Sequence, residues 1–111
     1  MAQSFARFGS EVTLLEAESR IMFSEDPEAA AVVEASLRRD GVNLLTDAKI
    51  TKVGSGEDGK VVSYEVGSES VDVTVDEILV GVGRAATTEG LGLERVGVTY
   101  DRHGVTVDDR K

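Results

Sequence analysis

The chain has 111 residues, 41% of them hydrophobic and 30% charged, which is the size and composition of one globular domain. Its 21 acidic and 12 basic residues give a net charge of −9, which disfavours nucleic acid and anionic membranes as partners because both bind basic surfaces. The absence of cysteine excludes disulfides and thiolate metal sites, and a single histidine leaves no pair for zinc. No apolar stretch approaches the roughly 20 residues that span a bilayer, so we expect one soluble, cytoplasmic domain over residues 1–111.

The first part of the sequence predicts two helices and two strands in alternation. Residues 2–9 favour a helix that ends at a glycine and presents Phe5, Phe8 and two alanines on one face. The apolar run at 11–16 is typical of a strand covered on both sides, as in parallel sheets. Acidic residues and a proline, followed by two arginines and a glycine, delimit a helix between 24 and 41. A buried strand at 42–45 completes a strand–helix–strand unit. The helix face that we expect to pack on the sheet consists of Ala29, Ala30, Val32, Val33 and Leu37.

The sequence then changes to the two-residue period of antiparallel strands. Three segments alternate apolar and polar residues around the turn sequences GEDG and GSES, at 48–55, 60–67 and 70–75. They predict a β-meander over about residues 48–76, with one face covered and the other in water. The unbroken apolar run at 77–83 predicts a further buried strand. The tail predicts a short helix or turn and a last strand at 105–107.

Candidate ligand contacts follow the buried strands, because ligands of doubly wound sheets lie beyond the carboxyl ends of the parallel strands. Glu16 is either a solvated strand end or the carboxylate that accepts hydrogen bonds from an adenosine ribose and repels a 2′-phosphate. Arg20 lies near enough in sequence to offset that repulsion. The glycines of VGVGR, residues 80–84, either admit a ring or ribose close to the backbone or form a tight turn. Arg84 pairs either with a phosphate or with a neighbouring carboxylate.

The remaining polar clusters indicate structure rather than catalysis. The acidic sequence SEDPE caps the helix that follows, since Glu25, Asp26 and Glu28 cannot all point at one metal centre. His103 lies in a polar sequence and is expected in an exposed turn. No arrangement combines a nucleophile with its base, so we expect neither catalytic residues nor a metal site in this chain.

The order of these pieces resembles the NAD-binding domain of the pyridine nucleotide-disulfide oxidoreductases, most of all that of dihydrolipoamide dehydrogenase and mercuric reductase. The series FARFGSEVTLLEA, EDPEAAAVVEASLRRDGVNLL, the meander, DEILVGVGR and TEGLGLERVGV carries the resemblance over nearly the whole chain. It implies a truncated Rossmann-like parallel sheet with an antiparallel three-stranded meander as crossover. It also implies that Glu16 holds the adenosine ribose of NAD, or of NADP, that Ile50 borders the adenine, and that Gly83 approaches the nicotinamide.

The chain also departs from the family pattern. Family members usually continue the Gly-Arg with one residue, then Pro and Asn, whereas this chain has Ala85, Ala86 and Thr87, which predicts a looser loop. The first strand and the Gly-rich phosphate loop, the flavin domain with its redox cysteine pair, and the dimerisation domain with its catalytic histidine are not in the sequence. The resemblance therefore implies a domain fragment of a homodimeric, FAD-dependent enzyme that binds its flavin outside this segment. Such a fragment cannot run the reaction alone.

Two other hypotheses stay open. The chain is either a non-catalytic α/β interaction module that docks on a partner supplying the missing strand, or an α/β domain without a nucleotide site. The missing strand would lie between the strands at 11–16 and 77–83, and unpaired strand edges pair readily with other chains. We therefore expect the isolated chain either to close this gap internally or to self-associate.

Overall fold

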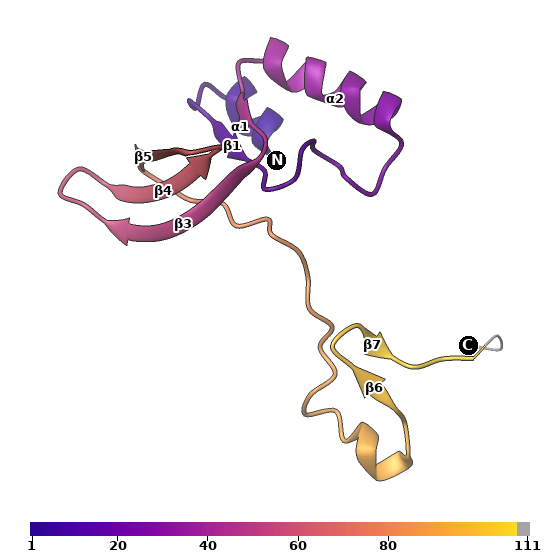
Figure 1. Ribbon diagram of the computed structural model, residues 1–111. Helices are drawn as coiled ribbons and strands as arrows, with labels where there is room; N and C mark the ends of the chain where they lie inside the picture. The colour runs from indigo at the N-terminus through magenta and orange to yellow at the C-terminus, as the bar shows by residue number, and fades with distance from the viewer. Residues whose placement is uncertain (109–111) are drawn as a thin grey trace. The chain divides into compact units, whose positions relative to one another are not determined.

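A computed structural model describes residues 1–108, and the chain forms two compact units, Met1–Ile78 and Leu79–Lys111 (Figure 1). The elements of the first unit are α1 (Ala2–Arg7), β1 (Thr13–Leu15), α2 (Pro27–Arg39), β2 (Asn43–Leu45), β3 (Ala48–Ser55), β4 (Lys60–Val66) and β5 (Glu69–Val75). Those of the second are the 3₁₀ helix η1 (Leu93–Val96) and the strands β6 (Tyr100–Asp101) and β7 (Gly104–Val105). The α/β fold class is confirmed. The grouping of 1–111 into one domain stays a prediction, and its last three residues lie outside the described part.

The predicted strand–helix–strand unit is confirmed. Strands β1 and β2 pair in parallel with Leu14 opposite Leu44, and α2 is the crossover between them. The main-chain ladder extends past both ends of β1, because Asn43 N–H donates to Val12 (2.9 Å) and Glu16 N–H to Leu45 (2.9 Å). A parallel pair needs such a crossover, since its strands cannot be joined by a tight hairpin.

A small apolar core lies between α1, α2 and the parallel strands. Its buried members are Ile21, Leu37, Val42 and Leu44, with Ala6, Val12 and Leu14 packed against them. The three residues of β1 are only half-buried, so the prediction of a strand covered on both sides is wrong. The physical reason is that, within residues 1–108, β1 has β2 as its one hydrogen-bonded neighbour.

The predicted helix faces need correction. The buried positions of α2 are Ala30 and Leu37, whereas Val32 is 71% exposed and Ala29 and Val33 are also exposed. Ala30 and Leu37 are seven residues apart and share one line of the helix, while Val32 lies about 200° around the axis from Ala30. In α1 the expected face is correct only at Ala6, which contacts the core. Phe5 and Phe8 are 44% and 83% exposed, and Phe8 lies beyond the end of the helix at Arg7.

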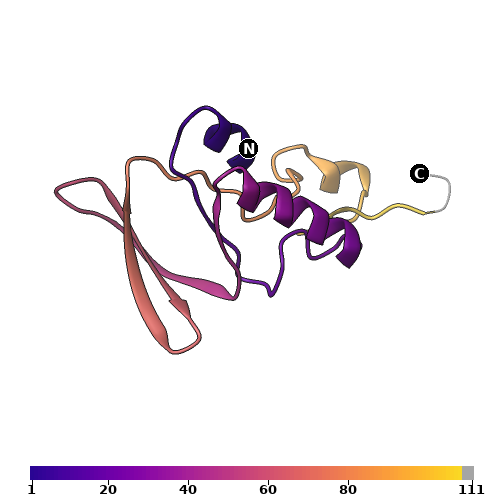
Figure 2. The ribbon, with the colours of Figure 1, turned by 90° about the horizontal axis from the view of Figure 1, so that it is seen from above.

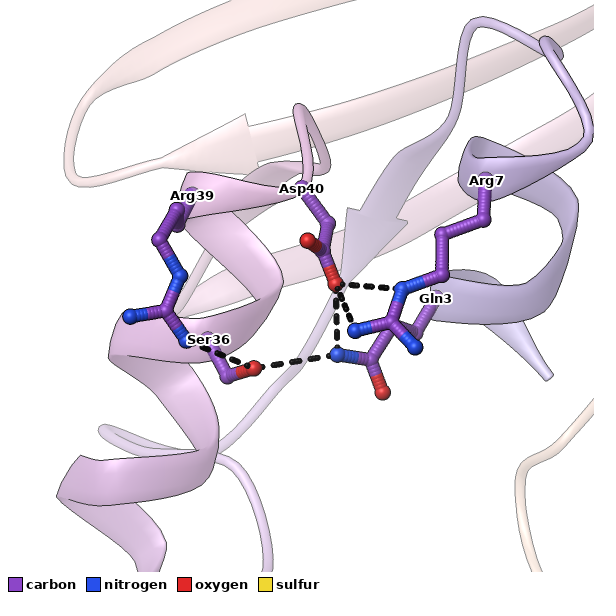
Figure 3. A network of polar contacts seen from close by, with 5 residues as sticks. All are labelled: Gln3, Arg7, Ser36, Arg39 and Asp40. Atoms are coloured by element: carbon purple, nitrogen blue, oxygen red, sulfur yellow. Dashed lines mark hydrogen bonds and ion pairs between the residues drawn. The ribbon is translucent and has the colours of Figure 1, made fainter.

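A polar network joins α1 to the carboxyl end of α2 (Figure 3). The Gln3 side-chain amide donates to Ser36 Oγ (3.0 Å) and Asp40 Oδ2 (2.6 Å), and Arg7 pairs with the same carboxylate oxygen at 2.8 Å. A carboxylate at a helix carboxyl end is unfavourable beside the helix dipole, so Asp40 depends on these donors. The hydrogen bond from Gln3 and the charge and hydrogen bond of Arg7 hold the pKa of Asp40 below 3.8, against the effect of its burial.

The three antiparallel strands of the predicted meander are confirmed. Strands β3, β4 and β5 form one antiparallel sheet, with Val62 opposite both Val53 and Val73. The turn between β3 and β4 points away from α2 in both views (Figures 1 and 2). Val62 and Tyr64 of the central strand are buried, whereas Val53 is 57% exposed, so only the middle of the apolar face is covered. Gly59 closes the β3–β4 turn with a φ of +145°, and an added Cβ would stand 2.7 Å from the Val75 carbonyl oxygen.

The predicted buried strand at 77–83 is wrong. Residues 78–83 form no strand, and Leu79, Val80 and Val82 are 60%, 72% and 85% exposed. An apolar run becomes a buried strand only where a neighbouring strand completes its hydrogen bonds, and none of the strands within residues 1–108 pairs with it. In the second unit, the predicted short helix is η1. The last strand, predicted at 105–107, is β7 at Gly104–Val105, which pairs with β6. No helix in the described part of the chain could span a membrane.

Asp40→Asn should destabilise the chain at neutral pH, by an amount that shrinks as the pH falls. The sign follows from the lowered pKa of Asp40, because its contribution is complete above 3.8 and is lost as the pH falls through the lower folded-state pKa. Urea unfolding of both chains over an acidic pH series measures the difference. Asp58→Asn, in the exposed β3–β4 turn, is the matched control. If the difference in free energy of unfolding between the Asp40 variant and the unchanged chain were the same at every pH, the lowered pKa of Asp40 would be contradicted.

Candidate functional site

Glu16 lies where β1 ends, at the carboxyl edge of the parallel strands. Its N–H donates to Leu45 of β2, and its carbonyl accepts from Ala48 N–H of β3 at 2.9 Å. Its half-buried side chain folds back on the loop that follows, because Oε1 accepts the Glu18 N–H at 3.1 Å. The second carboxylate oxygen has no hydrogen-bond or ion-pair partner among the described residues. The main chain of Glu16 therefore links two sheets, while half of its carboxylate is available to a ligand.

Arg20 does not offset the charge of Glu16 in the way that its position in the sequence suggested. Within the described part of the chain it forms no ion pair with Glu16. Its guanidinium donates instead to the main-chain carbonyls of Met22 (2.7 Å), Phe23 (2.6 Å) and Glu25 (3.0 Å). The negative charge of Glu16 is thus not paired with its nearest cation in sequence.

Ile50, the expected neighbour of an adenine, lies on β3 opposite Tyr64 and is 45% exposed. The strand that carries it starts at Ala48, whose N–H donates to Glu16. A β-bulge interrupts the β3–β4 register between Ile50 and Lys52, and bulges redirect side chains near their position. The structure thus brings the start of β3 to Glu16 and leaves nearly half of the Ile50 surface open.

Gly83 belongs to the second unit and is described apart from Glu16 and Ile50. Its φ of +123° is a conformation that side chains disfavour, although an added Cβ would meet no atom within 4 Å. Glycine is therefore favoured at position 83 by the backbone conformation and not by a lack of space for a side chain. Arg84 is exposed and follows directly, and residues 85–89 line an open hollow of about 650 Å³ together with Tyr100, Asp101 and Arg102.

The whole sequence, residues 1–111, matches the family model described as pyridine nucleotide-disulphide oxidoreductase. The chain belongs to this family. It is 40% identical to dihydrolipoyl dehydrogenase of Thermus scotoductus over 94% of its own length and 23% of the relative's. It is 33% identical to mercuric reductase of Staphylococcus aureus over 94% of its length and 19% of the relative's. The family resemblance carried by the sequence motifs is confirmed.

A solved structure shows the same fold. The HOCl-induced flavoprotein disulfide reductase RclA from Escherichia coli, in its Cu(II) complex, superposes with a TM-score of 0.83 at 34% identity, covering 98% of this chain and 24% of that one. The chain therefore spans about a quarter of the length of such family members. The comparisons do not test the individual residues Glu16, Ile50 and Gly83, whose roles in this family member stay predictions.

The other polar positions of this family member have structural surroundings. Asp26 caps α2, since its Oδ1 accepts the N–H groups of Glu28 (2.9 Å) and Ala29 (3.2 Å), as the sequence predicts. His103 is exposed in the β6–β7 turn, with its N–H donating to Asp101 Oδ1, which confirms its predicted place. No group of three or more His, Cys, Asp or Glu residues within 1–108 is arranged to hold a metal ion.

Asp26→Ala should lower the free energy of unfolding by about 0.5–2 kcal/mol, because two N–H groups of the first turn of α2 lose their acceptor. Asp26→Ser should recover most of the loss, since a hydroxyl also accepts these bonds. Urea unfolding at neutral pH measures both. Glu25→Ala, which removes an adjacent carboxylate outside the cap, is the control and should cost far less. An equal loss from both alanine variants, or stabilisation of the unchanged chain by Mg²⁺, would contradict a capping role.

Proposed function

We propose that this chain is the NAD(P)-binding domain of an FAD-dependent pyridine nucleotide-disulfide oxidoreductase, in which it positions NAD(P)H for hydride transfer to the flavin. The observation that carries the proposal is the place of Glu16. The carboxylate of this half-buried residue has one oxygen without a partner among the described residues, and it stands at the carboxyl end of β1, in the parallel unit of a family member. That edge is where doubly wound folds bind ligands.

The residues on the first unit fit the adenosine half of a dinucleotide. The free oxygen of Glu16 accepts hydrogen bonds from ribose hydroxyls, which are donors of the right kind for a carboxylate. The open part of Ile50 offers an apolar surface to a flat adenine. Both residues are tied to the start of β3, because Ala48 bonds to Glu16 and stands two positions before Ile50.

The charge of Glu16 favours NAD over NADP. A 2′-phosphate close to an unpaired carboxylate is repelled by it. Repulsion between close like charges lowers the affinity for the ligand that carries the extra charge, which here is NADP. Among the described residues no cation pairs with Glu16, so none offsets the extra charge of NADP at this position. Gly83, in the second unit, is assigned to the nicotinamide half on the family resemblance and on its open backbone.

In this proposal the chain binds and orients, and the cofactors carry the electrons. When bound, NAD(P)H supplies a hydride and FAD, held outside residues 1–111, accepts it. The remainder of the flavoprotein is the proposed partner, in a homodimeric enzyme that reduces a disulfide or a metal ion. Contiguous exposed apolar surface often marks a site that another segment covers. The exposed side chains of Leu79, Val80 and Val82 are consistent with such a partner.

A non-catalytic interaction module is the second candidate, and the unpaired edge of strand β1 is the observation that favours it. With β2 as the one strand paired to β1 among residues 1–108, its other edge is open to a partner strand. The two functions differ in one observable. A nucleotide-binding domain contacts NADH, whereas the interaction module binds a strand from its partner and ignores the cofactor.

Glu16→Ala should weaken NADH binding on the order of tenfold or more, because charge-assisted hydrogen bonds to the ribose are lost. The same change should reduce the preference for NADH over NADPH, since the repulsion disappears with the charge. Saturation-transfer NMR of the chain with either cofactor, titrated to millimolar concentration, measures both effects.

Glu11→Ala is the matched control, because it removes an exposed carboxylate from the segment that precedes β1 and should leave binding unchanged. Equal affinities of the Glu16 variant and the unchanged chain would remove Glu16 from the site. Absence of any NADH signal from the unchanged chain at millimolar cofactor would contradict the proposed function and leave the interaction module.

A further inference from the structure

The connection between β1 and α2 is folded around one side chain, that of Arg20. Residues 17–26 contain no helix or strand, yet three of their carbonyl oxygens accept from the Arg20 guanidinium at 3.0 Å or less, and a fourth, that of Ile21, accepts at 3.5 Å. Nη2 donates to Phe23 and Glu25, and Nη1 donates to Met22 at 2.7 Å. A guanidinium presents its donors in a rigid planar fork, so three simultaneous bonds determine the path of the loop more closely than one would.

Other contacts hold the same path. The backbone of Met22 has a φ of +51°, which a side-chain-bearing residue rarely adopts without support from its surroundings. Glu25 N–H donates to Met22 at 2.9 Å and closes the turn, and the Arg20 guanidinium lies 5.4 Å from the centre of the Phe23 ring. Ile21, next to Arg20, is buried in the core of the first unit. The loop is therefore anchored by Ile21 and shaped by Arg20.

The start of this loop orients Glu16. The Glu16 carboxylate accepts the N–H of Glu18, and the carbonyl of Glu18 accepts the Asp47 N–H at 3.0 Å. Glu18 precedes Arg20 by two residues, so displacement of the loop moves the donor that holds one oxygen of Glu16. The direction of the other oxygen depends on that donor in turn.

We propose that Arg20 is a positioning residue for Glu16, and that it sets a preference for dinucleotides without a 2′-phosphate. Its guanidinium holds the loop that orients the carboxylate, and these bonds direct both terminal nitrogens, Nη1 and Nη2, at carbonyls of that loop. Turning Arg20 toward a 2′-phosphate would remove the guanidinium donor of the Phe23 and Glu25 carbonyls, and one of the two donors of the Met22 carbonyl, and each lost bond costs free energy. This inference rests on the proposed function, since it assigns a role beside the same ribose site.

The opposite role for Arg20, as a direct ligand of a 2′-phosphate, makes a contrary prediction. A direct ligand would lose affinity for NADPH on substitution and keep its affinity for NADH. A positioning residue instead loses affinity for NADH and narrows the difference between the two cofactors. The two roles are thus separated by the sign of the change in preference.

Arg20→Ala in the full chain is the test, read first by amide hydrogen exchange. The N–H groups of Glu18 and Glu25 should exchange at least about tenfold faster, because the loop loses its support, while the N–H of Asn43, which donates to Val12 in the parallel pair, stays protected. Arg20→Lys should restore part of the protection through one or two bonds. Arg38→Ala is the control of equal charge, since Arg38 pairs with Glu34 on the surface of α2 at 2.9 Å. Unchanged exchange at Glu18 and Glu25 in the Arg20→Ala chain would overturn the proposal.

Cofactor titrations of the same chains provide the second readout. Arg20→Ala should weaken NADH binding several-fold and reduce the NADH-to-NADPH affinity ratio, whereas Arg38→Ala should change neither. A selective loss of NADPH affinity would overturn the positioning role in favour of a direct contact. If the unchanged chain binds neither cofactor, the proposed function fails and with it the cofactor preference. Faster exchange at Glu18 and Glu25 would then still support the effect of Arg20 on Glu16.

Discussion

The parallel pairing of β1 with β2 is the constraint on which the rest of the first unit depends. Because parallel strands need a crossover, α2 must cross over the pair, and its buried positions Ala30 and Leu37 follow from that packing. The same pairing places Glu16 at the carboxyl edge. From that edge the Glu16 carbonyl accepts the Ala48 N–H, so the point where the ladder ends is also where the meander begins.

The two helices are held to the core by different means. Helix α2 contributes buried apolar side chains, whereas the six residues of α1 contribute Ala6 and a polar network that ends on Asp40. An isolated helix of this length is unstable in water, so α1 depends on its contacts with the rest of the unit. The Asp40 carboxylate lies at the unfavourable end of the α2 dipole, and its contacts with Gln3 and Arg7 stabilise it there (Figure 3).

The sequence predicts those features that local chemistry determines. Pro27, the capping Asp26 and the glycine after α2 delimit that helix, and the turn sequences around Gly59 set the meander register. Features that depend on distant neighbours were mispredicted, because composition does not record pairing. The apolar run at 77–83 has the composition of a buried strand, but strand formation requires a partner that no described residue supplies.

In the candidate site too, the sequence predicts the features that local chemistry determines and misses those that depend on distant neighbours. The position of Glu16 at a strand end follows from the apolar run before it, and the family resemblance assigns the residue a ligand. The engagement of Arg20 with three carbonyls was not predictable, because it requires the left-handed backbone of Met22 and the path of the whole loop. A local pattern shows that an arginine is near in sequence, but only the fold shows which acceptors it reaches.

From the sequence, Glu16 is interpreted either as a solvated strand end or as the carboxylate that holds a ribose. The two interpretations are compatible, because they concern different groups of the residue. Its main-chain groups bond to β2 and β3, a task that any residue except proline performs. One carboxylate oxygen accepts the Glu18 N–H, which a glutamine carbonyl would do equally well. Within residues 1–108, folding makes no use of the second oxygen or of the negative charge, in a chain that already carries a net charge of −9. The proposed recognition of a ribose, and the proposed exclusion of a 2′-phosphate, rest on this oxygen and this charge.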